Sequence, residues 1–231
     1  MTIRLDKYLA SVTDYSRAEA KRLLKQKRVT VEGKVVTDPT AAVSEVALVA
    51  IDGENLRSVS NRYFMLHKPQ GYISATKDRT HITVLELLEE DNIDQLHIAG
   101  RLDIDTTGLL LISDDGVWSH RVTSPRKDCK KTYWLETFDP ISPEQIEKIE
   151  QGIKLDSEKK PTLPATLELL DDHTARLTIS EGKYHQVKRM FAAIGNHVER
   201  LHRERIGAIL LDQALSEGEY RALTVEEVAS I

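Results

Sequence analysis

The amino-terminal residues show apolar spacings that are typical of short helices. Leu5 and Leu9 lie one helical turn apart, which predicts a helix over residues 4–10. Ser16 and Glu19 form the S-x-x-E capping-box pattern, so a second helix is expected to begin there and to run to about residue 27. Three apolar residues give this second helix a face to bury: Ala20, Leu23 and Leu24.

The second predicted helix also carries a basic face. Its basic side chains follow one another at spacings of three or four residues, which places them together: Arg17, Lys21, Lys25 and Arg28. Residues 28–36 then alternate like a hairpin, with Glu32 and Gly33 at the turn. We therefore expect a small domain over residues 1–59, whose basic helix suits contacts with phosphates.

Strand and helix patterns alternate in the rest of the chain, after a polar stretch at 56–62 that predicts a linker. Apolar or alternating stretches predict strands at 63–67, 109–112, 131–137, 175–179 and 206–211. Periodic patterns and caps predict helices at 83–88, 143–152 and 187–194, and a last one capped by Thr224 and Glu227. Because these elements lack the regular spacing of βαβ units, we expect an α+β domain over residues 60–231 with a mixed, mostly antiparallel sheet flanked by helices.

Composition indicates a folded chain, with 40% hydrophobic and 30% charged residues among 231. No apolar run approaches the roughly 18 residues that a membrane span needs. The first residues mix acidic and basic side chains where a signal peptide has an apolar core. The single cysteine, Cys129, excludes an internal disulfide. We therefore expect a cytoplasmic protein without a membrane partner.

The net charge of −5 argues at first against a nucleic-acid partner, but the charges are unevenly distributed. Residues 1–40 hold nine Lys and Arg against five Asp and Glu, residues 117–134 hold five against one, and residues 181–205 hold six against three. A polyanion responds to the local field and not to the sum. Basic segments that converge on one face would bind RNA, whereas scattered ones would be ordinary solvated surface.

The segment Gly100–Leu111 carries the densest candidate chemistry. Two acids, Asp103 and Asp105, lie in a tight polar loop directly before an apolar strand. Such a loop can present a carboxylate rigidly, and a carboxylate can act as a nucleophile. The structural alternative is a polar turn whose acids accept bonds from backbone N–H groups.

Two metal-dependent interpretations compete for this loop. The D-x-D-x-T order resembles the aspartyl nucleophile of Mg²⁺-dependent phosphotransferases, but the preceding strand pattern is poor and Asp171–Asp172 is a weak second acidic pair. The spacing from Asp103 to Asp114 also fits a Ca²⁺ loop, although apolar residues 109–112 read as buried strand. A zinc site is not indicated, because the histidines lack ligand spacing and Cys129 has no cysteine partner.

Two further segments carry candidate ligands for an anion or a base. Residues 180–190 join a strand to a helix, and Lys188 and Arg189 fall in the first turns of that helix, off its apolar face. Residues 130–133 place a basic pair before Tyr133, an aromatic residue in a strand. Taken singly, each segment is also compatible with a polar helix start or with packing.

Together these segments resemble the RsuA/RluA family of pseudouridine synthases. Four stretches are similar to that family's motifs and occur in family order: Lys68–Gly71, Gly100–Leu111, Lys131–Tyr133 and Glu181–Met190. The module at residues 1–59 resembles the S4 RNA-binding domain that precedes the catalytic domain in the RsuA branch. Gly100, where the RluA branch has His, and Lys188, where that branch has Arg, fit the RsuA branch.

The resemblance implies roles for individual side chains. Asp103 would be the nucleophile, Tyr133 would lie against the target uracil, and Lys188 would pair with Asp103. Arg101 would help to fill the space that the flipped base leaves. Further RNA contacts are expected from basic side chains and one histidine: Lys68, Arg17, Lys21, Lys25, Arg28, His185 and Arg189.

The resemblance also implies an isomerase of uridine in small-subunit (16S) ribosomal RNA, with uridine 516 as the expected target. Such an enzyme needs neither cofactor nor metal, because the reaction has no net redox change. The expected partner is 16S rRNA or the assembling small subunit, and we expect a monomer. The residues leave open whether Asp103 attacks uracil C6 or acts at ribose C1′. They also leave a non-catalytic RNA-binding or assembly protein as an alternative.

Overall fold

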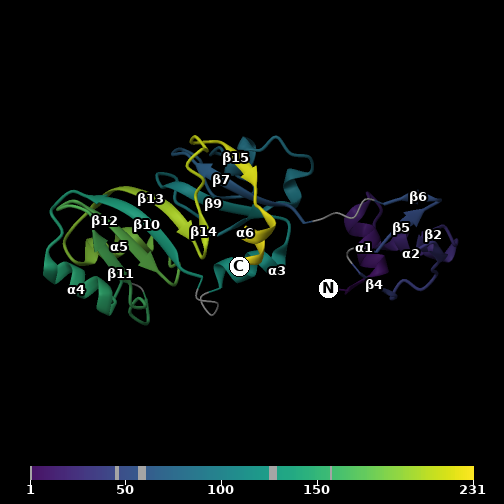
Figure 1. Cartoon of the computed structure of the whole chain (residues 1–231), viewed down its shortest axis with the longest axis horizontal. Helices are drawn as coiled ribbons and strands as arrows, with labels where there is room; N and C mark the ends of the chain where they lie inside the picture. The colour runs from purple at the N-terminus through teal and green to yellow at the C-terminus, as the bar shows by residue number, and fades with distance from the viewer. Residues whose placement is uncertain (1, 45–46, 57–60, 125–128, 157) are drawn as a thin grey trace. The chain divides into compact units, whose positions relative to one another are not determined.

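The computed structural model describes residues 2–44, 47–56, 61–124, 129–156 and 158–231. The chain divides into two compact units, Met1–Asn61 and Arg62–Ile231, here called the N-terminal and C-terminal units (Figure 1). The predicted linker at 56–62 falls largely on residues 57–60, which lie outside the described residues. Among the described residues, no helix combines the length and apolar character that crossing a membrane would need.

The N-terminal unit packs two helices against short strands. The helices are α1 (Leu5–Val12) and α2 (Arg17–Lys25). The strands are β1 (Thr2–Arg4), β2 (Val29–Val31), β3 (Lys34–Val35), β4 (Ala42–Ser44), β5 (Val49–Ile51) and β6 (Glu54–Asn55). Four strands form a sheet in the order β3-β2-β5-β6, and β1 pairs with β4. The capping box that opens α2 is present, and Glu32 and Gly33 make the turn between β2 and β3 with positive φ, so both predictions are confirmed.

The C-terminal unit is built on a nine-stranded sheet in the order β11-β12-β10-β13-β9-β7-β15, with β8 and β14 added at β9 and β13 (Figure 1). Its strands are β7 (Tyr63–Lys68), β8 (His97–Ala99), β9 (Thr107–Ser113), β10 (Lys131–Thr137), β11 (Thr166–Leu169), β12 (Thr174–Ile179), β13 (Val198–Ile206), β14 (Ile209–Leu210) and β15 (Tyr220–Ala222). Every strand pair named here is antiparallel except β9 with β13, which is parallel. The predicted α+β fold with a mixed, mostly antiparallel sheet is confirmed.

Helices cover both faces of this sheet. They are α3 (Gly116–Thr123), α4 (Pro143–Gln151), α5 (Gln186–Ala193) and α6 (Val225–Ala229), with 3₁₀ turns at Val84–Leu87 and Ile93–Gln95. One core includes residues of α4 and α5 with Leu110 and Ile112 of β9, and the other includes residues of α3 and α6 with Leu109 and Leu111. Because β9 is buried on both faces, all four consecutive positions are apolar, and the usual alternation is absent.

Two predicted elements differ in the structure. Residues 206–211 are not one strand, since β13 ends at Ile206, Gly207 turns the chain with a φ of 57°, and β14 begins at Ile209. The helix expected at 83–88 is the 3₁₀ turn Val84–Leu87. Strand β13 has the sequence VERLHRERI. It was not predicted, because its many charged residues leave no clear apolar pattern.

Candidate active site

A cavity of about 460 Å³ opens in the C-terminal unit between the loop after β8 and the turn before α5. It is lined by side chains from segments that are far apart in the sequence. Five of the residues that sequence analysis or resemblance singled out line it together: Arg101, Asp103, Tyr133, His185 and Lys188. The sheet therefore brings the central loop, the tyrosine strand and the last motif to one place.

The backbone around Asp103 is tied down on both sides. Ser74 Oγ donates to the carbonyl oxygen of Leu102 at 2.8 Å and accepts from its N–H at 3.0 Å. The N–H of Thr106 donates to the carbonyl oxygen of Asp103 at 3.1 Å, which closes a tight turn. Such a loop holds the Asp103 carboxylate in place while leaving 28% of its side chain exposed to the cavity.

Lys68 supports the same loop through bonds to its backbone. Its side chain is fully buried, and its ammonium donates to the carbonyl oxygens of Pro69 (2.9 Å) and Thr106 (2.8 Å) and more weakly to that of Ile104 (3.4 Å). Burial lowers its pKa from 10.5 to about 8, although Asp105 and Asp103 oppose the shift. The RNA contact of Lys68 stays a prediction, and in this structure the Lys68 side chain is fully buried beneath the loop.

Two cationic or protonatable side chains face the Asp103 carboxylate. His185 Nε2 lies 3.3 Å from Oδ1 of Asp103, and Lys188 Nζ lies 4.0 Å from Oδ2. Lys188 makes a closer bond to Asp105, at 2.5 Å from Oδ1. Burial works to raise the pKa of Asp105, but the bond and charge of Lys188 outweigh it, and the pKa is lowered. Lys188 is thus shared between two carboxylates and closer to Asp105.

Tyr133 forms the inner wall of the cavity together with a residue that sequence analysis missed, Arg203. Tyr133 is 9% exposed, and its ring lies beneath the guanidinium of Arg203 at 5.9 Å from the ring centroid. The buried guanidinium donates to the carbonyl oxygens of Gly100 (2.7 Å), Arg101 (3.3 Å) and Leu109 (2.8 Å), and lies 3.5 Å from the Tyr133 hydroxyl. Arg203 therefore joins the Asp103 loop to Tyr133.

A β-bulge puts Arg203 on the cavity side of the sheet. Along β13, Arg203 pairs with Tyr133 and Arg205 pairs with Thr132, so Glu204 is the extra residue. Simple alternation would place Arg203 and Arg205 on one face, but a bulge reverses the order beyond it. Arg205 accordingly lies on the opposite side, beside Thr132 and Glu204 in a separate groove.

Gly108 lets the two strands that carry the site approach each other. It pairs with Arg203 of β13 and with Lys68 of β7, and its φ is +105°. A Cβ at this position would lie 2.4 Å from the carbonyl oxygen of Arg203. The position thus needs glycine both for its backbone conformation and for the close contact.

The remaining expected RNA contacts are placed unequally. Arg101 is exposed and lines the cavity. Arg189 instead donates to the carbonyl oxygen of Tyr184 at 3.0 Å and binds Glu158, so it holds the turn before α5. In the N-terminal unit Arg17 pairs with Asp6 and Arg28 pairs with Asp52. Lys21 and Lys25 are exposed on α2 between them.

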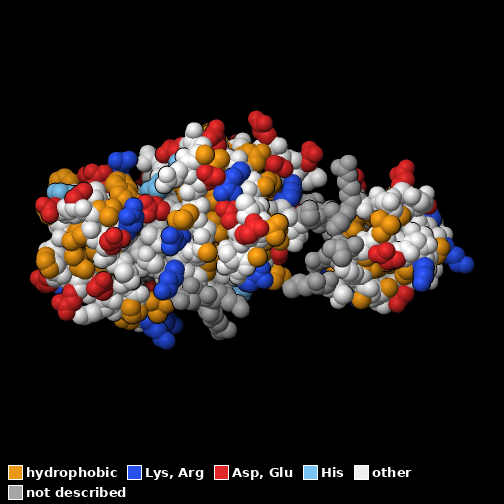
Figure 2. Space-filling model, viewed as in Figure 1, with side chains coloured by type: hydrophobic (Ala, Val, Ile, Leu, Met, Phe, Trp, Pro, Cys, Tyr) orange, Lys and Arg blue, Asp and Glu red, His pale blue; other side chains and the backbone are white. Residues whose placement is uncertain are grey.

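The basic segments do not form a simple uniform surface. On the face that Figure 2 shows, acidic and basic side chains are interspersed over the C-terminal unit. Part of the segment 117–134 falls on residues 125–128, which lie outside the described residues. Lys131 in that segment is buried and donates to the carbonyl oxygen of Val122 at 3.0 Å. The three basic segments of the sequence therefore do not converge on this face as one continuous basic surface.

Neither metal-dependent interpretation fits the geometry well. In the described parts of the chain, no three His, Cys, Asp or Glu side chains converge as metal ligands. Asp171 bonds to the N–H groups of His173 and Thr174 in its own turn. Residues 107–113 between Asp103 and Asp114 form strand β9, which a Ca²⁺ loop would not contain.

Known proteins resemble this chain along its whole length. Residues 62–193 match the model for the family described as RNA pseudouridylate synthase, and residues 3–45 match that for the S4 domain. Ribosomal small subunit pseudouridine synthase A of Yersinia pestis is 53% identical, covering 99% of this chain and 98% of that protein. The protein of that name from Escherichia coli strain K12 is 53% identical over 99% of this chain and 100% of its own. A crystal structure of a pseudouridylate synthase matches with a TM-score of 0.72 and 44% identity, covering 99% of both chains.

Proposed function

Since the chain belongs to the RNA pseudouridylate synthase family and is an isomerase, we propose that it converts uridine 516 of 16S ribosomal RNA into pseudouridine, with Asp103 as nucleophile. The observation that carries this proposal is the Asp103 carboxylate, held in a cavity of about 460 Å³ with His185, Lys188 and Tyr133 around it. The S4 domain match and the names of the relatives support ribosomal RNA as the substrate.

The reaction needs one carboxylate and a place to turn the base. The N1–C1′ bond breaks and a C5–C1′ bond forms, while C5 loses a proton and N1 gains one. A carboxylate whose ordinary pKa is near 3.9 is ionised at neutral pH and can serve as the nucleophile. The position of Asp103 suits attack either at uracil C6 or at ribose C1′, and both routes require the target base to enter the cavity.

The base enters the cavity by leaving its stack in the RNA, which costs a few kcal/mol. Stacking on an aromatic side chain returns about 1–3 kcal/mol per base. Tyr133 offers its ring from the cavity wall, where Arg203 fixes it relative to the Asp103 loop. Arg101, exposed at the cavity, is placed to occupy the space left in the RNA.

Lys188 keeps the acidic loop charged in a partly enclosed site. Two carboxylates close together repel each other, so an intervening ammonium stabilises both in the ionised form. The Lys188 nitrogen lies 2.5 Å from Asp105 and 4.0 Å from Asp103, so its charge acts mainly on Asp105 and more weakly on Asp103. Because its closer bond is to Asp105, Lys188 leaves the Asp103 carboxylate less tightly paired.

The N-terminal unit supplies affinity for the RNA backbone. We assign it residues 1–59 and the catalytic domain residues 60–231, with Lys21 and Lys25 on α2 as its most available phosphate contacts. Such contacts position the RNA without reading its sequence. We expect the protein to act as a monomer in the cytoplasm on 16S rRNA or on the assembling small subunit.

Tritium release from 16S rRNA labelled at uridine C5 tests the proposal. The wild type should release tritium in the presence of EDTA, and sequencing should place the pseudouridine at position 516. Asp103→Asn should bind the RNA with unchanged affinity and release only background tritium. Modification at another uridine would correct the target, whereas salt-sensitive binding without release from rRNA or assembling subunits would leave an RNA-binding protein.

A further inference from the structure

An exposed aromatic pair stands at the mouth of the cavity. Tyr184 is 72% exposed, so most of its ring is accessible to a ligand. Its ring stacks on the ring of His185, with the centroids 3.8 Å apart and the planes inclined by 20°. One face of the Tyr184 ring is therefore covered, and most of the remainder is open to solvent.

His185 connects the Tyr184 ring to the Asp103 carboxylate. Asp103 Oδ1 lies 3.3 Å from His185 Nε2, and the Tyr184 ring follows His185 as the next layer. Tyr184 also lines the cavity itself. The spacing of these two rings is close to the roughly 3.4 Å that separates successive stacked bases along a nucleic-acid strand. The Tyr184 ring is thus about one base layer away from the side chain that touches the nucleophile.

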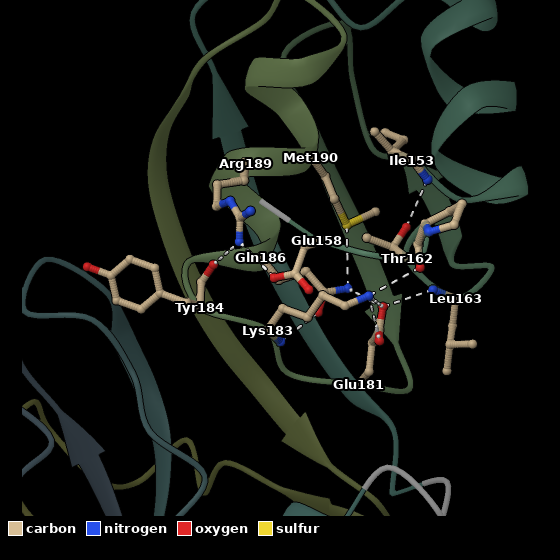
Figure 3. Close-up of polar contacts among 11 residues, drawn as sticks. Ile153, Glu158, Thr162, Leu163, Glu181, Lys183, Tyr184, Gln186, Arg189 and Met190 are labelled. Atoms are coloured by element: carbon tan, nitrogen blue, oxygen red, sulfur yellow. Dashed lines mark hydrogen bonds and ion pairs between the residues drawn. The ribbon is translucent and has the colours of Figure 1, made fainter. Parts of the chain in front are cut away.

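A network of polar contacts holds the turn before α5, which contains Tyr184 (Figure 3). Glu181 accepts from the N–H of Leu163 at 2.8 Å and from the side-chain amide of Gln186 at 3.1 Å. Arg189 donates to the carbonyl oxygen of Tyr184 at 3.0 Å. In Figure 3 the Tyr184 ring points away from this network. The backbone of Tyr184 is consequently fixed, and little conformational entropy remains to be lost when something stacks on its ring.

We propose that Tyr184 is a stacking platform for the nucleotide next to the target uridine. A ring of this kind binds any base, since every base has a π-face. Arg101 is exposed, lines the same cavity as Tyr184 and carries positive charge that an RNA backbone would attract. This inference rests on the proposed function, and it extends the substrate site from one flipped base to two consecutive nucleotides.

The platform also explains how the target base is kept from returning to its stack in the RNA. When a uridine leaves the stack, its neighbour loses a stacking partner and favours closure of the gap. A tyrosine ring on that neighbour replaces the lost contact, while the target lies in the cavity. The contact therefore acts on RNA affinity and on the population of the flipped state, and not on the bond-breaking step.

The test is a double-mutant cycle between Tyr184 and the RNA, in an Asp103→Asn background that prevents turnover. Tyr184→Ala should weaken binding of a 16S rRNA fragment centred on the target by about tenfold, whereas Tyr184→Phe should retain it. An abasic nucleotide on one side of the target should cost a similar factor with Tyr184 present and little with Tyr184→Ala. Phe138→Ala is the matched control, because Phe138 is 65% exposed in the same unit but does not line the cavity.

The outcomes separate this proposal from the function on which it rests. Additive losses for the abasic nucleotides on both sides, or unchanged binding by Tyr184→Ala, would overturn the platform. Tritium release by the otherwise wild-type enzyme is measured in parallel, and its absence would sink the proposed function whatever the cycle shows. If Tyr184→Ala weakens binding to the assembling subunit but not to any RNA fragment, the ring contacts a protein and the RNA platform is wrong.

Discussion

Arg203 is buried, charged and tied to the backbone of the loop that presents Asp103. A guanidinium has five donors in a fixed plane, so it can hold several carbonyl oxygens at set angles, which a single ammonium cannot do. Here the carbonyl oxygens belong to Gly100, Arg101 and Leu109, and the Tyr133 hydroxyl lies beside them. Arg203 thus positions the Asp103 loop and the Tyr133 ring relative to each other.

Replacing Arg203 should therefore affect turnover more than RNA binding. Arg203→Met removes the guanidinium and should lower kcat about 10²-fold through misplacement of the loop, with KM nearly unchanged. Added methylguanidinium should partly restore kcat of Arg203→Ala, because the cavity gives it access. Arg205→Met, beyond the bulge on the opposite side of the sheet, should retain full activity. An equal rise in KM, or no rescue, would indicate a general loss of structure instead.

Lys68 predicts a pH dependence of stability. Its pKa is about 8 in the folded protein against 10.5 in the free side chain, because burial disfavours the charged form. Between these values the unfolded chain binds more protons than the folded protein, so the free energy of unfolding attributable to Lys68 rises with pH. The rise should be up to about 2 kcal/mol between pH 8 and 9.5. Urea unfolding of wild type and Lys68→Met measures the difference, and a flat or falling difference would contradict it.

At the scale of elements, Gly108 sets how closely β9 and β13 approach. Gly108→Ala should destabilise the protein by about 1–3 kcal/mol from the positive φ alone, and further from contact with the Arg203 carbonyl. Activity should fall with stability, since the shift displaces Arg203. Gly116→Ala is the control, because no heavy atom lies within 4 Å of its added Cβ and it does not line the cavity. The free energy of unfolding of both variants is measured in urea. A loss in Gly108→Ala alone indicates the close contact with β13, whereas an equal loss in both contradicts this explanation.

The elements also show what the sequence could and could not predict. Strands with clear apolar patterns, such as 109–112 and 131–137, and helices with caps, such as that after Ser16, were found because local chemistry determines them. Strand β13 was missed because its exposed face is charged and its bulge breaks the alternation. Arg203 was missed for the same reason, because only its pairing with Tyr133 in the folded sheet shows that Arg203 faces the cavity and Arg205 does not.

For the candidate site, too, residues in local motifs were predicted, and placements that depend on tertiary packing were not. Asp103, Tyr133 and Lys188 were singled out because each lies in a motif with a recognisable family resemblance, and the fold brings them to one cavity. Lys68 was expected to contact RNA because it lies in the first motif, and the motif alone could not show that the sheet buries its side chain completely. Tyr184 lies within the last motif but was not singled out, because no sequence pattern distinguishes an exposed tyrosine from a packed one.

At the scale of the whole molecule, the N-terminal unit should determine the salt dependence of binding. Replacing both Lys21 and Lys25 by alanine should weaken binding of 16S rRNA and reduce the slope of log K against log salt by about 1.4–1.8. The rate of isomerisation at saturating RNA should not change, because Asp103 lies in the other unit. Lys34→Ala, exposed on β3 of the same unit, is the matched control. An unchanged slope would remove α2 from the RNA-binding surface.

The parallel contact between β9 and β13 has a consequence for the order of folding and for local opening of the folded protein. It consists of two residue pairs, and its partners Thr107 and His202 are 95 residues apart in the chain. Joining such distant strands costs loop-closure entropy, so this seam is expected to form late in folding. The Asp103 loop, which precedes β9, and Tyr133 of β10 lie on opposite sides of this contact. Native-state hydrogen exchange should therefore detect an opening at this seam below the global unfolding free energy, which would disassemble the site while both halves of the sheet stay folded.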